Sequence, residues 1–298
     1  MSLDTVGTAL IRRHVGRRLT KLREKSGLTQ EQAAQRLEKG RSTIIRMEDG
    51  ADNVRFRDID LKAMLEVYGA STEEATVVLA LAAETRNGKK KGWWHDYTEL
   101  PEWFGLYVVL EDSATSIREY ESELIPGLLQ TQEYAELLYR TPSGSTTPEQ
   151  AKQRVQARME RQSVLDRPTA PRFVVVLNEA VVRRPIGDDG LMTRQLERLL
   201  EVGKHSNVSI RILPFAAGMH GGMAAGNSFM LLDFPEDPSG EPIEPSLAYV
   251  DTLTGAMYLD KPSEFAAYEL VWRDVDKKAL SAAKSKELII SALEGFAR

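Results

Sequence analysis

Residues 28–50 constrain the fold most, because they describe two short helices joined by a connection of only three residues. Thr29 can cap the first helix, and Gln32, three positions later, completes the pattern of a capping box. After a turn at residues 38–40, the second helix ends just before Gly50, a typical terminator. Helices this short must bury their apolar sides against each other and against further helices. The sequence therefore predicts a tightly packed helical pair.

The second helix of this pair leaves one side free for outside contacts. Ile44 and Met47 point inward, whereas arginine and hydroxyl side chains gather near its N-terminal half. In a pair of this kind that end enters the major groove of DNA. Arginine bonds guanine with two hydrogen bonds, and Ser, Thr and Gln can reach base edges or phosphates. The residues predicted to contact bases are Gln30, Arg41, Ser42, Thr43 and Arg46.

The charge distribution also favours DNA as the partner. Residues 1–50 carry 11 Lys and Arg against 6 Asp and Glu, whereas the other 248 residues carry 28 against 38. The formal net charge of −5 therefore hides a basic N-terminal segment that suits a polyanion. Basic side chains and the positive end of a helix position a duplex through its phosphates. The predicted phosphate contacts are Arg12, Arg13, Arg17, Thr29, Lys39 and Arg55.

Three more helices complete an N-terminal domain. Apolar side chains recur at helical spacing from Ile11 to Leu22, and further helices are expected over residues 56–68 and 71–86. The prediction is an all-α, five-helix domain over residues 1–87. A Gly- and Lys-rich linker at residues 88–92 follows it.

The helical pair resembles the phage-repressor-type (Xre superfamily) helix-turn-helix. The shared pattern runs through Leu-Thr-Gln-Glu at residues 28–31, Ser-Thr-Ile at residues 42–44, and Glu48 and Gly50. The chain departs from it at the turn, where Glu38 and Gly40 replace the usual Gly and Ser. The resemblance implies DNA reading by the second helix, with a slightly looser turn and no Ser cap.

Residues 93–298 read as a separate α+β or α/β domain with a mixed sheet of about five strands. Strands are expected over residues 173–177, 208–212, 227–233, 247–253 and 256–259, and helices over 103–121, 131–140, 148–165, 191–202, 262–279 and 284–296. Strand, helix and strand over residues 173–212 indicate a parallel crossover. Six aromatic residues between Trp93 and Tyr107 are expected to close one end of this domain, and the proline-rich residues 234–246 to form a surface loop.

The second domain also resembles a known family. Its marks include Gly92-Trp93-Trp94, Leu100-Pro101-Glu102-Trp103-Phe104, the stretch from Ile125 to Thr131, Leu177-Asn178-Glu179-Ala180, and Thr252-Leu253-Thr254-Gly255-Ala256. The whole chain is similar to actinobacterial regulators that join an Xre-type N-terminus to a C-terminal domain of unknown function. That resemblance implies an antitoxin-like regulator, often encoded beside a very small acidic protein that it binds.

Composition excludes several other classes. The chain has no cysteine, no apolar run near the length of a membrane span and no export signal at its start, which predicts a cytoplasmic, nucleoid-associated protein. Its four histidines have no metal-ligand spacing. We therefore expect no membrane partner, metal or cofactor.

Other polar groups favour structure over chemistry. Glu119, Glu121 and Glu123, taken as helical, point apart and do not suit acid–base catalysis. His220 lies in a glycine-rich loop, and Glu179 is expected to pair with Arg183 or Arg184; for both, ligand contact is the alternative. The turn from Ile125 to Gln130 is expected to pack into the core, with an exposed partner surface as the alternative. We expect no enzyme.

The sequence thus predicts a transcriptional regulator that reads double-stranded DNA. The C-terminal domain is expected to provide homodimerisation and to bind an effector or partner, because a single helix reads too few base pairs. The alternative is an antitoxin-like protein that mainly sequesters a small protein from an adjacent gene and uses DNA binding for autoregulation.

Overall fold

The computed structural model describes residues 8–51, 54–87, 102–140, 147–237, 239–252 and 255–297, with only the backbone described at 8, 9, 84, 87 and 102–105. The chain forms two compact units, one of residues 1–92 with 234–244 and one of residues 93–233 with 245–298. The predicted linker at residues 88–92 and most of the predicted aromatic cluster lie outside the described residues.

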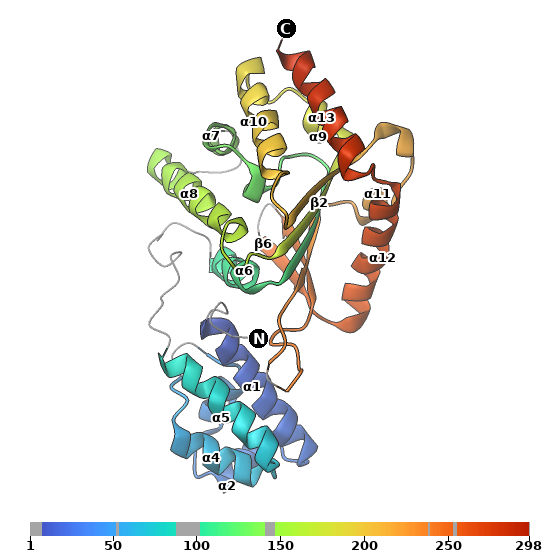
Figure 1. Ribbon diagram of the computed structural model, residues 1–298. Helices are drawn as coiled ribbons and strands as arrows, with labels where there is room; N and C mark the ends of the chain where they lie inside the picture. Colours follow the sequence, from blue (N-terminus) through green and yellow to red (C-terminus); the bar gives the residue numbers. More distant parts are fainter. Residues whose placement is uncertain are drawn as a thin grey trace. The chain divides into compact units, whose positions relative to one another are not determined.

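Within residues 8–51 and 54–87, the first unit forms five helices, as predicted: α1 Thr8–Lys25, α2 Gln30–Arg36, α3 Arg41–Glu48, α4 Asp58–Val67 and α5 Thr72–Asn87 (Figure 1). Both bonds of the predicted capping box form between Thr29 and Gln32 at the start of α2. The end of α3 lies directly against α1. A Cβ at Gly16 would stand 2.2 Å from the carbonyl oxygen of Glu48, and one at Gly50 would stand 2.4 Å from that of Arg12. Only glycine allows this approach.

The turn between α2 and α3 places Glu38 in the left-handed region, at φ +52°. This is the position after the end of a helix where glycine is preferred, because a Cβ costs about 1–2 kcal/mol in that conformation. Gly40 then precedes α3 at φ −68° and offers no side-chain cap. The departures from the usual pattern at this turn therefore both cost stability.

Reversing these departures should stabilise the first unit. We expect Glu38→Gly to raise its free energy of unfolding by about 1 kcal/mol, and Gly40→Ser to add a few tenths through a new cap. A Cβ at Gly40 meets nothing closer than 3.8 Å. Hydrogen exchange of the α3 amides measures the change. Glu24→Gly, in the last turn of α1 where the backbone is right-handed, is the matched control and should lower stability and not raise it. A loss of stability in Glu38→Gly would contradict the assignment of strain.

Residues 234–244, which we call the arm, differ from the prediction of a surface loop in the second domain. They belong to the first unit. The arm is a narrow hairpin with an antiparallel bridge between Glu236 and Pro242 and a 2.8 Å bond from the Ile243 amide to the Pro235 carbonyl. Phe234 and Ile243 are buried.

The second unit is built on a six-stranded mixed sheet of order β3-β2-β1-β4-β5-β6. Its strands are β1 Ser116–Glu121, β2 Arg172–Asn178, β3 Val208–Leu213, β4 Phe229–Asp233, β5 Leu247–Thr252 and β6 Gly255–Leu259. β1, β2 and β3 are parallel and β4, β5 and β6 join antiparallel. α10, Asp189–Val202, makes the predicted crossover between β2 and β3.

The predicted helix over residues 103–121 is wrong beyond α6, Glu102–Ser113. Residues 116–121 form β1, which lies between β2 and β4 in the middle of the sheet. The prediction failed because Arg118, Glu119 and Glu121 make this strand look too polar for a buried position. The extra strand also explains why the sheet has six strands and not five.

Helices cover both faces of the sheet (Figure 1). On one face, α12, Pro262–Lys278, places Trp272 and Val275 in a core with Tyr120 and Phe229. On the other face, Tyr107 of α6 packs against Tyr249, with their ring centroids 4.4 Å apart. The other α-helices among the described residues of this unit are α7 Gln132–Arg140, α8 Pro148–Arg161, α9 Glu179–Arg183, α11 Gly221–Ala225 and α13 Ala282–Phe296.

Candidate nucleic-acid interface

α3 presents a polar side outward while its apolar side anchors it. Ile44 and Met47 are buried. Arg41, Ser42 and Arg46 are exposed, and Thr43 is half-buried. Arg46 Nε donates a 3.2 Å bond to the Ser42 carbonyl, and within the described residues neither Arg41 nor Arg46 forms an ion pair. Four of the five predicted base-contacting residues therefore lie together on one helix.

Gln30, the fifth predicted base contact, is tied down at the start of α2. Its Nε2 donates a 3.0 Å bond to Glu48 Oε2. The buried Glu48 carboxylate also accepts bonds from Arg23, at 2.7 Å from Nε and 3.1 Å from a terminal nitrogen. Tyr68 Oη lies 3.5 Å from the same carboxylate. Glu48 therefore fixes the start of α2, the end of α3 and α1 relative to one another.

This buried group was missed in the sequence. Glu48 lies four residues after the inward-facing Ile44, so helical spacing indicates its inward position. Its partner Arg23 also donates a 2.9 Å bond to the Leu28 carbonyl, which holds the segment leading into α2. The hydrogen bond with Glu48 raises the pKa of Arg23, and burial raises the pKa of Tyr68. The charges of Arg23 and Glu48 compensate each other inside the helical core.

The six predicted phosphate contacts lie in different surroundings. Thr29 and Arg55 are exposed. Lys39 bonds Asp60 at 2.7 Å. Arg12 donates to the backbone of Ala51 at 2.9 Å and stacks over Phe56.

Arg13 and Arg17 pair with Glu244 of the arm, at 3.1 and 2.8 Å. The sequence predicts phosphate contacts for Arg12, Arg13 and Arg17. The structure differs, because each of the three guanidinium groups already contacts an acceptor within the protein. The arm approaches from residues more than 200 positions away in sequence, which local spacing does not reveal. Their contact with phosphates stays a prediction.

The second unit contains a cluster of buried polar side chains whose arrangement differs from the prediction. On β1, residues two apart share a face, so Glu119 and Glu121 lie on the same side of the sheet and do not point apart as predicted. Beside them, Arg161 of α8 lies 2.9 Å from Glu111 of α6. Gly127 makes room for Arg161, since a Cβ there would stand 2.4 Å from its guanidinium.

Glu119 is only 2% exposed, and within the described residues its Oε1 has no hydrogen-bond partner. Burial, reinforced by the charge of Glu121, raises the pKa of Glu119 well above its usual range. Burial also raises the pKa of Glu121 to about 7, although the Ser228 hydroxyl donates it a 2.6 Å bond. Both carboxyl groups therefore keep their protons up to a higher pH than an exposed glutamate does.

The other groups singled out in the sequence have structural partners. Glu179 bonds Arg183 at 2.6 Å and the Phe215 amide at 2.8 Å, as expected for a structural pair. Ile125, Leu128 and Leu129 are buried in the core. His220 is buried beside Tyr120, and burial lowers its pKa.

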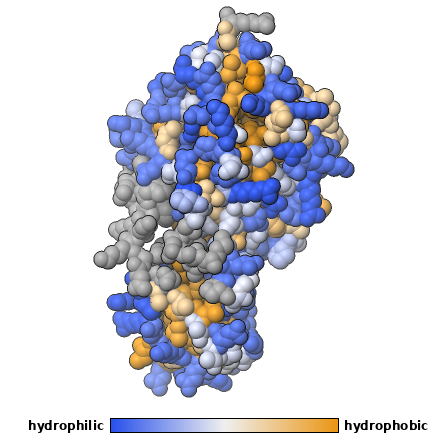
Figure 2. Space-filling view, in the orientation of Figure 1, coloured by the Kyte–Doolittle hydropathy of each residue, from blue (hydrophilic) through white to orange (hydrophobic). Residues whose placement is uncertain are grey.

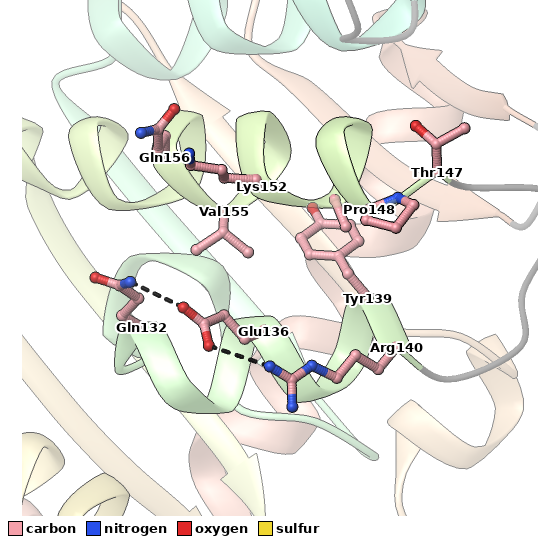
Figure 3. Close-up of a pocket in the computed structure, with 10 residues that line it drawn as sticks. Gln132, Glu136, Tyr139, Arg140, Thr147, Pro148, Lys152, Val155 and Gln156 are labelled. Carbon is pink, nitrogen blue, oxygen red and sulfur yellow. Dashed lines mark hydrogen bonds and ion pairs between the residues drawn. The ribbon is translucent and has the colours of Figure 1, made fainter.

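A groove of about 610 Å³ lies between α7 and α8 (Figure 3). Tyr139 and Val155 lie between the two helices, and Glu136 at the rim bonds Gln132 at 2.8 Å and lies 3.7 Å from Arg140. Its volume falls in the range of small-molecule sites. Among the described residues, no three carboxylate or imidazole groups come together as metal ligands.

Figure 2 shows hydrophilic residues over most of the visible surface of both units. Within the described parts of the chain, every helix is too short or too polar to cross a lipid bilayer.

In the helical unit, α3 exposes its polar side and buries its apolar side. This arrangement defines a protein with an N-terminal helix-turn-helix domain. Residues 14–77 match the family described as Helix-turn-helix domain. Residues 104–291, more than half of the chain, match the family described as Domain of unknown function (DUF5753), and the protein belongs to this family. No curated protein and no solved structure matches the chain significantly.

Proposed function

We propose that this protein is a sequence-specific transcriptional regulator that reads the DNA major groove with α3. The observation that carries this proposal is the exposure of Arg41, Ser42 and Arg46 on a helix whose other side is buried. The Xre-type sequence pattern supports the same reading. Such a regulator acts in the cytoplasm on nucleoid DNA and needs no catalytic chemistry.

Bases and phosphates have separate readers in this proposal. Arg41 and Arg46 donate to guanine edges, while Ser42 and Thr43 bond base edges or phosphates. The exposed N-terminal end of α2 at Thr29 attracts a phosphate, and Arg55 adds a second contact. A single recognition helix reads few base pairs, so we propose a homodimer on two half-sites about one helical turn apart.

The C-terminal domain supplies regulation in this proposal. The groove between α7 and α8 has the size and mixed lining of an effector site. A second candidate role, sequestration of a small partner protein, is favoured by three exposed apolar side chains close in sequence: Phe215 is 60%, Met219 81% and Met223 61% exposed. Co-purification with the product of the adjacent gene tests that role, and Met219→Lys should abolish it.

Replacing one reading arginine tests the DNA assignment. Arg46→Ala should weaken binding to the selected DNA site by about 1–3 kcal/mol and relax the preference at one base pair. Fluorescence anisotropy on matched and random duplexes measures both effects. Arg273→Ala, which removes an exposed arginine from α12, is the control and should bind as the parent does. If Arg46→Ala discriminated between the two duplexes as well as the parent, α3 would not be the reading helix.

A further inference from the structure

The arm holds three carboxylates against the basic side of α1. Asp237, Glu241 and Glu244 all pair with α1 side chains. Because the arm belongs to the helical unit, these contacts are part of the DNA-reading domain itself. The arm is nevertheless continuous with the sheet of the other unit, since it leaves β4 at Asp233 and returns to β5 at Leu247.

Asp237 is the deepest of these contacts. Its side chain is fully buried, and its Oδ2 lies 3.0 Å from His14 Nε2 and also bonds Arg18. Its Oδ1 accepts bonds from the Ser239 amide at 2.8 Å and the Glu241 amide at 3.1 Å. Burial would raise the pKa of Asp237, but the hydrogen bonds from Ser239 and His14 prevail and hold it well below its usual range. The carboxylate is therefore charged and bound on both oxygens.

Glu244 makes the second buried contact and Glu241 a peripheral one. The Glu244 side chain is 1% exposed and pairs with Arg13 at 3.1 Å and Arg17 at 2.8 Å. The Glu241 side chain is 44% exposed and lies 3.4 Å from both Arg18 and Lys21. Removing a buried partner leaves an uncompensated charge, whereas removing an exposed one changes little. Asp237 and Glu244 therefore hold the arm on α1.

The arm and α3 contact opposite sides of α1. An α-helix turns about 100° per residue. Arg12, Gly16 and Arg23, which contact α3 or the segment after it, fall on one side of α1. His14, Arg17 and Lys21, which contact the arm, fall on the opposite side. The arm therefore leaves the reading residues of α3 uncovered while it bears on the helix that supports them.

We propose that the arm couples the conformation of the C-terminal sheet to that of the DNA-reading helix. Rearrangement of β4 and β5 when the C-terminal domain binds its effector or partner pulls on α1 through Asp237 and Glu244. By reciprocity, DNA on α3 must change the stability of β4 and β5. The coupling to DNA rests on the proposed function, whereas the grip of the arm on α1 does not.

Hydrogen exchange of the full-length protein tests both parts. Without DNA, Asp237→Asn combined with Glu244→Gln should speed exchange of the α1 amides about tenfold or more and leave α13 unchanged. With the selected duplex bound, the parent should slow exchange in β4 and β5 as well as in α3. The double variant should protect α3 alone. Glu241→Gln is the control and should behave as the parent.

Distinct outcomes separate the two claims. If the exchange of the α1 amides were unchanged in the double variant, the claim that Asp237 and Glu244 stabilise α1 would be rejected, independently of any result with DNA. Equal protection of β4 and β5 by DNA in parent and double variant, or none in either, would overturn the coupling. Failure of every duplex to protect α3 would reject the DNA-reading function, and the DNA-free measurement would still decide the grip. If the double variant does not fold, Glu244→Gln alone, against the half-exposed Arg13 and Arg17, gives the same comparison.

Discussion

Glu48→Ala is expected to lower the stability of the helical unit by about 3–5 kcal/mol, because it leaves the buried Arg23 charge uncompensated. The variant also removes the acceptor that holds Gln30 at 3.0 Å and the guanidinium of Arg23 at 2.7 Å. The start of α2 and the end of α3 would then lose their common anchor. DNA binding should fall with the fraction of folded helical unit.

Hydrogen exchange of the α3 amides is the appropriate measurement for this variant. All four tryptophans lie at residue 93 or later, so tryptophan fluorescence would follow the other unit. Asp49→Ala, at the exposed neighbouring position, is the matched control and should change stability little. If Glu48→Ala and Asp49→Ala behaved alike, the Arg23–Glu48 pair would not hold the helices together. Replacing Arg23 with Met and Glu48 with Leu together should recover much of the lost stability.

Glu119→Gln should stabilise the C-terminal unit, and the gain should depend on pH. A carboxyl group whose pKa is raised by folding binds its proton more tightly in the folded state, so stability falls as pH rises above the unfolded value. Glu119 and Glu121 both have raised pKa values, that of Glu121 about 7. The parent should therefore lose stability between about pH 5 and pH 8.

The side-chain amide of glutamine does not ionise, so no charge has to be desolvated in the folded state at high pH. The variant therefore does not show the part of the stability loss that Glu119 causes. We expect Glu119→Gln to be more stable than the parent at pH 8 and nearly equal to the parent at pH 5, because only the charged form of Glu119 carries the cost of burial. Denaturation followed by tryptophan fluorescence reports on this unit, since Trp272 lies in its core. Glu123→Gln, at an exposed position four residues further on, should show no such difference. A destabilised Glu119→Gln at pH 8 would mean that the buried carboxylate is used in its charged form.

Local sequence signals predicted most of the helical unit and its outer face. The capping box at Thr29 and the exposed side of α3 depend on spacings of a few residues, which a sequence displays directly. The Glu38 backbone was a partial success, since the departure from the usual glycine was visible but its left-handed conformation was not.

The errors arise where distant residues decide the outcome. β1 carries Glu119 in the interior because α6 and α8 supply polar neighbours from other parts of the chain. The sequence predicts a surface loop at the arm because its prolines and carboxylates are typical of one. Its partners His14, Arg17 and Arg18 lie more than 200 residues away, and no local pattern connects them. For the same reason Arg13 and Arg17 looked free for phosphates.

Selection of duplexes from a random double-stranded library with the purified full-length protein tests the central claim most directly. We predict enrichment of one sequence as two inverted half-sites about one helical turn apart, with the enrichment lost when Arg41 and Arg46 are both changed to alanine. Folded protein that enriches no sequence, or an alanine variant that enriches the same sequence equally well, would contradict DNA reading by α3.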